Sequence, residues 1–187
     1  MSPSLSEAKV EPQESVPRLR ITGSVGRELS WDLADLRAID SKWQVEDVSQ
    51  IDPRRSGRAV RLAGLLEACR ANPDARYLTL HATRDDFHAS IPLAPVRDSA
   101  VLIYEQDGHS LPVRQGGPYR FLIPDFGACH TSEIDECANV KFVEWMELGV
   151  GKGIDNRPQD EQQHEELHRR EAAADAVGRQ QSDEERS

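Results

Sequence analysis

The chain has 187 residues, of which 37% are hydrophobic and 5% aromatic, and its formal net charge is −10. This length suggests one domain with some chain to spare, and the low apolar content suggests that part of the chain stays outside the core. The acidic balance argues against general nucleic-acid binding, because no cationic stripe is present to contact phosphates. No apolar run approaches the roughly 20 residues that cross a bilayer, so no membrane association is expected.

Both ends of the chain are acidic and poor in apolar residues. Residues 1–17 are rich in Ser, Pro and Glu, and residues 155–187 hold ten acidic against five basic side chains. Such composition is typical of disordered or solvated segments. We therefore expect a disordered segment at 1–17, a folded domain at 18–154, and an acidic helical or disordered tail at 155–187 that is a candidate contact for a protein partner.

The N-terminus has neither the basic nor the apolar stretch of a secretory signal. The chain also holds three cysteines, an odd number, which favours free thiols over a disulfide framework. Both features predict a cytoplasmic protein.

The first half of the expected domain mixes short strands with two short helices. Residues 19–25 alternate apolar and polar side chains, which predicts a strand, and residues 43–48 predict another. Ser30 is predicted to cap a helix that runs from Trp31 to Ile39. Residues 60–70 place Leu62, Leu65, Leu66 and Cys69 at helical spacing, and Asn72-Pro73 ends that helix.

The second half is predicted to consist of strands. The segment 119–124 is short and dense in apolar residues, as expected of a strand covered on both faces. Segment 138–148 alternates apolar side chains, the pattern of a half-buried strand. Because strands and helices do not alternate as βα units, the predicted class is α+β with a mixed, mostly antiparallel sheet and short helices. The other predicted strands are 75–83, 87–93 and 100–106, the last followed by an Asp107-Gly108 turn.

The stretch QGGPYRFLIP, residues 115–124, places a fixed cation at the start of the apolar strand. Glycine allows positive φ and a close approach of the backbone to a ligand, and proline stiffens the turn. The planar guanidinium of Arg120 can bind a phosphate or an extended heterocycle through two parallel hydrogen bonds. An ordinary structural alternative is that Arg120 pairs with a neighbouring carboxylate and holds the turn.

Several stretches together resemble the molybdopterin-binding domain of the sulfite oxidase family. They are VRLAGLLEA, ARYLTLHA, DFHASIPL, AVLIYEQDGHSLPVRQGGPYRFLIPD and NVKFVEWMEL, and the resemblance covers about residues 19–150. It implies the sulfite-oxidase-like fold, an α+β domain that holds the molybdenum cofactor in a cleft. It also implies cofactor contacts at five positions, namely Gln115, Arg120, Asn139, Val140 and Lys141.

The chain departs from this family on the metal side of the site. The family's metal is held by one cysteine thiolate, a soft ligand that tunes a redox-active metal. That position falls on Asp47 here, and the family's cofactor-binding threonine corresponds to Ala82. Asp47 could ligate molybdenum through oxygen, or it could be a turn former at a strand end.

A second group of metal-ligating residue types lies between the two cationic strands. Cys129, His130 and Cys137 combine thiols with an imidazole, which suits zinc or iron, although the spacing is not a strong zinc pattern. A thiol of this group could also replace the lost cysteine. His164 and His168 stand four residues apart on one face of a predicted helix, where they are either ligands or solvated side chains.

Two functions follow from these observations. The first is a cytoplasmic, molybdopterin-dependent oxidoreductase-like domain that holds a small anionic cofactor, with or without sulfite-oxidase-type activity. The alternative is a non-catalytic module on the same fold, which binds another anion, a metal at Cys129, His130 and Cys137, or a protein partner.

Overall fold

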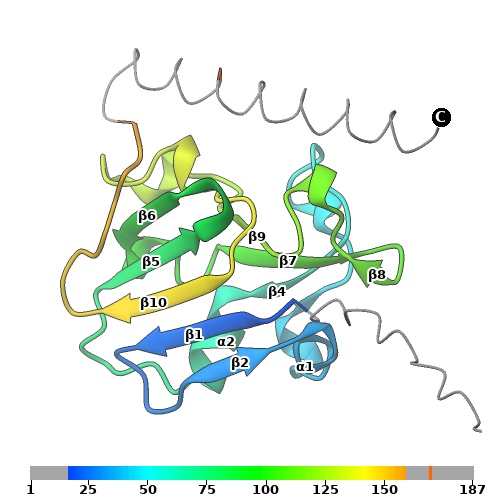
Figure 1. The fold of residues 1–187 in the computed structure, drawn as a ribbon, viewed down its shortest axis with the longest axis horizontal. Coiled ribbons are helices and arrows are strands. Elements are labelled where there is room, and N and C mark those ends of the chain that lie inside the picture. The colour runs from blue at the N-terminus through cyan, green and yellow to red at the C-terminus, as the bar shows by residue number, and fades with distance from the viewer. Residues whose placement is uncertain (1–16, 159–168, 170–187) are drawn as a thin grey trace, which may run out of the picture.

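The computed structural model describes residues 17–158 and Arg169, and two five-stranded sheets form the body of this part (Figure 1). In the first sheet the strands lie in the order β2-β1-β10-β5-β6. The β1–β10 pair is parallel, and the other neighbours are antiparallel. The bounds of these strands are β1 Leu19–Gly23, β2 Leu29–Trp31, β5 Tyr77–Ala82, β6 Phe87–Pro92 and β10 Trp145–Gly149.

The second sheet is built around β7, which pairs with β4 along one edge and with β8 and β9 along the other. All pairs of this sheet are antiparallel. Its strands are β3 Gln44–Val45, β4 Arg58–Arg61, β7 Val101–Gln106, β8 His109–Ser110 and β9 Arg120–Leu122. The helices are α1 Leu33–Arg37, α2 Leu62–Ala68 and α3 Leu93–Val96, and 3-10 turns cover Ser41–Trp43, Val48–Gln50, Thr83–Asp85, Val113–Gln115, Gly127–Cys129 and Glu136–Ala138.

The central strand β7 contributes to two hydrophobic clusters. Leu102 and Tyr104 point into the main core, which also takes the apolar face of the first sheet and the buried side of α2. Val101 and Ile103 point to the opposite side, into a smaller cluster. This alternation follows from the period of two along a strand, and it explains why segment 100–106 is apolar throughout.

The predicted α+β class with mostly antiparallel pairing is confirmed, while three element boundaries were wrong. Ser30 does not cap α1, because residues 29–31 form an edge strand. Asp32 is the N-cap instead, and its side chain accepts from the backbone N–H groups of Ala34 and Asp35.

The predicted strand at 43–48 is reduced to β3, which has only two residues. Asp40 and Asp47 each cap a 3-10 turn on either side of it, so capping side chains interrupt the strand pattern. The predicted strand at 138–148 begins only at Trp145. Before it, Phe142 has a φ of 55°, a left-handed conformation that does not fit a strand.

The segment after β10 crosses the first sheet and packs on its polar face. Gly153 N donates to Ser90 Oγ at 2.8 Å, and a side chain at Gly153 would collide with Thr79 Oγ1. Arg157 is 5% exposed and bonds to Asp155 at 2.7 Å and to Asp135 at 3.1 Å. Ordered contacts therefore continue to residue 157, three positions beyond the boundary predicted at 154.

Leu102 provides a test of the central role of β7. Leu102→Ala is expected to lower the free energy of unfolding by about 2–5 kcal/mol, because the fully buried side chain leaves a cavity in the main core. Chemical denaturation followed by circular dichroism measures this change. Val113→Ala is the control, since that side chain is 54% exposed, and an equal loss in both variants would contradict the assignment.

Candidate functional site

The QGGPYR turn forms around two glycines that are needed for different reasons. Gly116 has a φ of 88°, and a Cβ there would lie 3.0 Å from Lys141 Cγ and 3.1 Å from Arg120 Nη1. At Gly117 a Cβ would lie 1.7 Å from the carbonyl oxygen of Leu111. The turn is thus packed against its own preceding loop, and its Gly116 backbone is held between two cationic side chains.

Backbone hydrogen bonds bring Lys141 to this turn. Phe121 N donates to Val140 O at 2.9 Å, Val143 N to Tyr119 O at 2.9 Å and Phe142 N to Gly116 O at 2.8 Å. Residues 139–143 therefore run beside 119–123, although they are not a regular strand. Two segments that are separated in the sequence by the cysteine loop are joined at the candidate site.

Three of the five predicted cofactor contacts converge on Gly116. Arg120 is 6% exposed, and its Nη1 donates to the carbonyl of Gln115 at 3.0 Å. Lys141 packs against the same glycine from the neighbouring segment, residues 139–143. Gln115 therefore uses its backbone oxygen to orient Arg120, a role that the sequence did not suggest.

Asn139 and Val140 have structural tasks in this arrangement. The side-chain oxygen of Asn139 accepts from Ile123 N at 2.6 Å, and the carbonyl of Val140 accepts from Phe121 N. Both bonds fix the position of the next residue, Lys141. The Asn139 side-chain oxygen and the Val140 carbonyl are thus engaged within the fold.

The register of the second sheet places Arg120 and the Asp47 segment on the same face. Arg120 pairs with Ile103, Ile103 with Ala59, and Ala59 with Val45, and directly opposed residues share a face. The turn that follows Asp47 buries Val48 against this face. The segment that follows Asp47 therefore lies on the same face of the sheet as Arg120.

Asp47 itself is exposed and engaged locally. Its Oδ1 accepts from Ser49 Oγ at 2.7 Å and from Ser49 N at 2.9 Å. These hydrogen bonds hold the pKa of the Asp47 carboxyl below its ordinary value. Among the described residues, the only hydrogen-bond partners of this carboxylate are thus in its own turn, as expected of a cap.

The structure does not assemble Cys129, His130 and Cys137 into a metal site. Cys129 Sγ lies 3.8 Å from the carbonyl oxygen of Asp125 and 3.9 Å from that of Pro95. No three His, Cys, Asp or Glu residues within the described part of the chain lie close enough to hold a metal ion. The described residues therefore give no support to the zinc or iron interpretation. His164 and His168 lie outside the described residues.

A second set of cations lies beside the turn, and the sequence analysis missed it. A hollow of about 720 Å³ includes Gly117 and Pro118 in its lining. The sequence could have indicated two of these cations, because side chains alternate along an extended segment and positions 18 and 20 then share a face. The cations that line the hollow are Arg18, Arg20 and Arg84, of which Arg84 lies 4.8 Å from the ring centre of Phe142 and Arg20 5.3 Å from that of Trp145.

The polar face of the first sheet carries a row of side chains that leads away from this hollow. The register aligns Arg20, Trp145, His81 and His88 across four strands. The His81 ring stacks on Trp145 with centres 4.1 Å apart, and the Nδ1 atoms of His81 and His88 are 2.9 Å apart. One proton shared between these two nitrogens satisfies both Nδ1 atoms.

Comparison with protein families finds a match for the centre of the chain. Residues 56–132 match the oxidoreductase molybdopterin binding domain. The match includes Gln115 and Arg120, whereas Asp47 and Lys141 lie outside its limits. It bears out the resemblance seen in the sequence. Comparison with curated proteins gives no match.

Comparison of structures agrees on the fold. The sulfane dehydrogenase SoxCD from Paracoccus pantotrophus is similar with a TM-score of 0.52 and 18% sequence identity. The similarity covers 73% of this chain but 39% of the other, so this chain spans well under half of that protein. The described residues include no helix with the length and apolar character of a membrane span.

The histidine pair generates a prediction about pH. Burial lowers the pKa of His81, and the neighbouring His88 lowers it further, while Glu147 acts in the opposite direction. Asp86 is the carboxylate near His88. Because the folded chain then binds fewer protons than the unfolded chain below about pH 6.5, stability is expected to fall as the pH is lowered through that value.

Thermal unfolding between pH 7.5 and pH 5.5 measures this effect. His81→Gln is expected to flatten the fall in Tm over this interval, because the group that resists protonation is gone. His109→Gln, a change at an exposed position, is the control and should keep the slope of the parent. Equal slopes in all three proteins would show that the pair does not control the pH response.

Proposed function

We propose that the chain binds a molybdopterin-type cofactor with its anionic end between Arg120 and Lys141. The observation that supports this most directly is that the two side chains meet at Gly116, where a Cβ would lie 3.0 Å from Lys141 Cγ and 3.1 Å from Arg120 Nη1. A buried guanidinium with a lysine side chain beside it is suited to a phosphate group. The match of residues 56–132 to the domain family supports the same ligand class.

The residues present fit the anionic part of the cofactor. Arg120 is oriented by the Gln115 carbonyl. Lys141 is positioned by the side-chain oxygen of Asn139 and the carbonyl of Val140, which both accept from the neighbouring segment. These contacts hold the two cationic side chains in place before a ligand arrives. Fewer side-chain conformations are then lost on binding, so the entropic cost of binding is smaller. Arg18, Arg20 and Arg84 add positive charge beside the same turn.

The residues at the metal end do not fit the family's chemistry. A bound molybdenum cofactor supplies oxygen-atom transfer when a soft protein ligand completes its metal site. Asp47 stands at that position as a turn cap bonded to Ser49. The proposed function is therefore cofactor binding without sulfite-oxidase-type turnover, and we derive no reaction step through Asp47.

A non-catalytic binding module is the second candidate, and the same observation about Asp47 favours it. In that case the cationic turn holds an anionic small molecule other than the molybdenum cofactor. Released pterin distinguishes the two candidates, because only the first predicts a fluorescent pterin on denaturation.

Arg120 and Lys141 are expected to control cofactor content. In protein made in a cofactor-competent host, Arg120→Gln and Lys141→Gln should each reduce bound pterin by about tenfold or more, since each change removes a charge-assisted contact. Fluorescence of the released, oxidised pterin measures the content. Arg97→Gln and Lys42→Gln, at exposed positions, should retain the parent's content, and pterin-free parent protein would contradict the proposal.

Asp47 is expected to be dispensable for the pterin. Asp47→Asn keeps a side-chain oxygen that can cap the turn, so stability should change by less than about 1 kcal/mol, and pterin and molybdenum content should match the parent's. Metal analysis by mass spectrometry, with Cys129→Ser and Cys137→Ser measured alongside, checks this. Loss of molybdenum with retained pterin in Asp47→Asn would identify a carboxylate ligand and contradict the assignment of Asp47 as a cap alone.

A further inference from the structure

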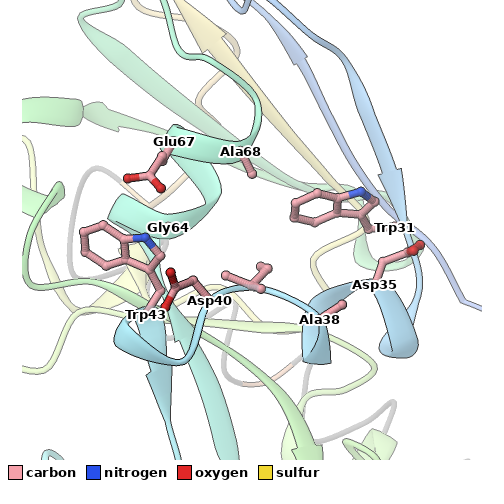
Figure 2. A pocket seen from close by; sticks show the side chains of 9 residues that line it. Trp31, Asp35, Ala38, Asp40, Trp43, Gly64, Glu67 and Ala68 are labelled. Carbon is pink, nitrogen blue, oxygen red and sulfur yellow. The ribbon is translucent and has the colours of Figure 1, made fainter.

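A second hollow, of about 390 Å³, lies between α1, the turn Ser41–Trp43 and α2 (Figure 2). None of its residues belongs to the candidate cofactor site. Two tryptophans and three carboxylates are part of its lining, and no Lys or Arg is. The rest of the lining is apolar or glycine, so the chemistry of the hollow is aromatic and acidic.

The tryptophans lie at opposite ends of the hollow, with Gly64 and Ala68 of α2 between them (Figure 2). Trp31 extends from the edge strand β2, and Trp43 ends the turn that leads into β3. A Cβ at Gly64 would lie 2.6 Å from Trp43 Cγ, so this indole packs directly on the backbone of α2. The indole of Trp43 and the small side chain of Ala68 form an apolar floor along which an aliphatic chain can lie.

The three carboxylates of the hollow serve as caps or as ion-pair partners. Asp35 accepts from Asp32 N and Asp40 accepts from Lys42 N, both at 3.0 Å. Glu67 lies 3.3 Å from Lys42 Nζ, and Arg18 lies 3.5 Å from Asp35. No Lys, Arg or His side chain forms an ion pair with Asp40 in the part of the chain that the structure describes.

Lys42 shows how a cation is held at one end of this hollow. Its ammonium nitrogen lies 5.0 Å from the ring centre of Trp43 and also pairs with Glu67. An aromatic face combined with a carboxylate is a favourable environment for a Lys or Arg side chain. Trp31, at the other end, has no cation over its ring among residues 17–158.

Trp43 also carries an unsatisfied donor. Its Nε1 is excluded from solvent, and no acceptor lies within hydrogen-bond distance in the described part of the chain. A buried donor without an acceptor costs free energy, and because solvent does not reach this atom, it makes no contact with a ligand in the hollow.

We propose that this hollow, the Trp31–Trp43 groove, binds a basic peptide segment of a partner protein. The methylene stem of an Arg or Lys side chain lies on the floor of Trp43 and Ala68, and its charged end meets Trp31 and Asp40. Tryptophans at the centre of an interface are the residues that commonly contribute most to binding.

Binding of a fluorescein-labelled nonapeptide of alternating arginine and leucine tests the proposal. The full chain is titrated and followed by fluorescence anisotropy, and a glutamate–leucine peptide of equal length is the charge-reversed probe. The variant Asp35→Asn/Asp40→Asn/Glu67→Gln removes three charges but keeps the capping oxygens, and it should weaken arginine-peptide binding by about tenfold. Saturable binding of the arginine peptide with this loss supports the groove.

The matched control is Glu28→Gln/Asp98→Asn/Asp107→Asn, which makes the same charge change at exposed positions elsewhere. Non-specific attraction to a chain of net charge −10 would weaken equally in both variants, and that result would overturn the proposal. Equal binding of the glutamate–leucine peptide would also overturn it. So would a dimer in size-exclusion chromatography that excludes the arginine peptide, because the occupant would then be a second copy.

Indole N–H signals in nitrogen-15 spectra locate the contact. The chain has three tryptophans, so Trp145 serves as an internal reference outside the groove. Titration with the arginine peptide should shift the signals of Trp31 and Trp43 and leave Trp145 in place. A shift of the Trp145 signal alone would place the binding site at the cationic hollow and contradict the proposal. Binding of n-butylammonium as tightly as the peptide would also contradict it, because the groove would then be a site for small cations.

Discussion

The hydrogen bonds between residues 119–123 and 139–143 are the contact on which the candidate site depends. They join β9 to a segment that follows the cysteine loop, and Phe142 N closes the arrangement on the carbonyl of Gly116. Without this pairing Arg120 would remain in its sheet, but Lys141 would have no reason to lie near it. Irregular backbone is well suited to this task, because its N–H and C=O groups are not all committed to a ladder.

The sequence predicted the local chemistry of this region better than its geometry. The glycines, the proline and Arg120 could be interpreted from residue properties, and the resemblance supplied Lys141 as their companion. The left-handed Phe142 and the late start of β10 could not be foreseen, because Val140, Phe142, Met146 and Leu148 alternate in the sequence as they would in a strand. In the structure Val140 and Val143 are buried and Phe142 is only partly buried, so the irregular backbone breaks the period that the sequence suggests.

Capping residues explain most of the other differences between prediction and structure. Asp32, Asp40 and Asp47 each accept from a backbone N–H two residues ahead, and each begins a short helical turn. A carboxylate at such a position is ambiguous in a sequence, because the same residue type suits a metal ligand or a cap. The resemblance allowed both roles for Asp47, and its hydrogen bonds to Ser49 are those of a cap.

Close packing against a glycine links the two regions for which we propose ligands. Gly116 is covered by Arg120 and Lys141, and Gly64 is covered by Trp43. In both places the absent side chain lets a large side chain from elsewhere in the sequence rest on the backbone, which fixes the cation or the indole where a ligand can reach it. The two regions differ in charge, since one gathers Arg and Lys and the other Asp and Glu. A chain with a negative net charge can therefore bind an anionic cofactor at one place and a basic segment at another. The reason is that charges within a few ångströms of a ligand outweigh the screened charges of the distant surface.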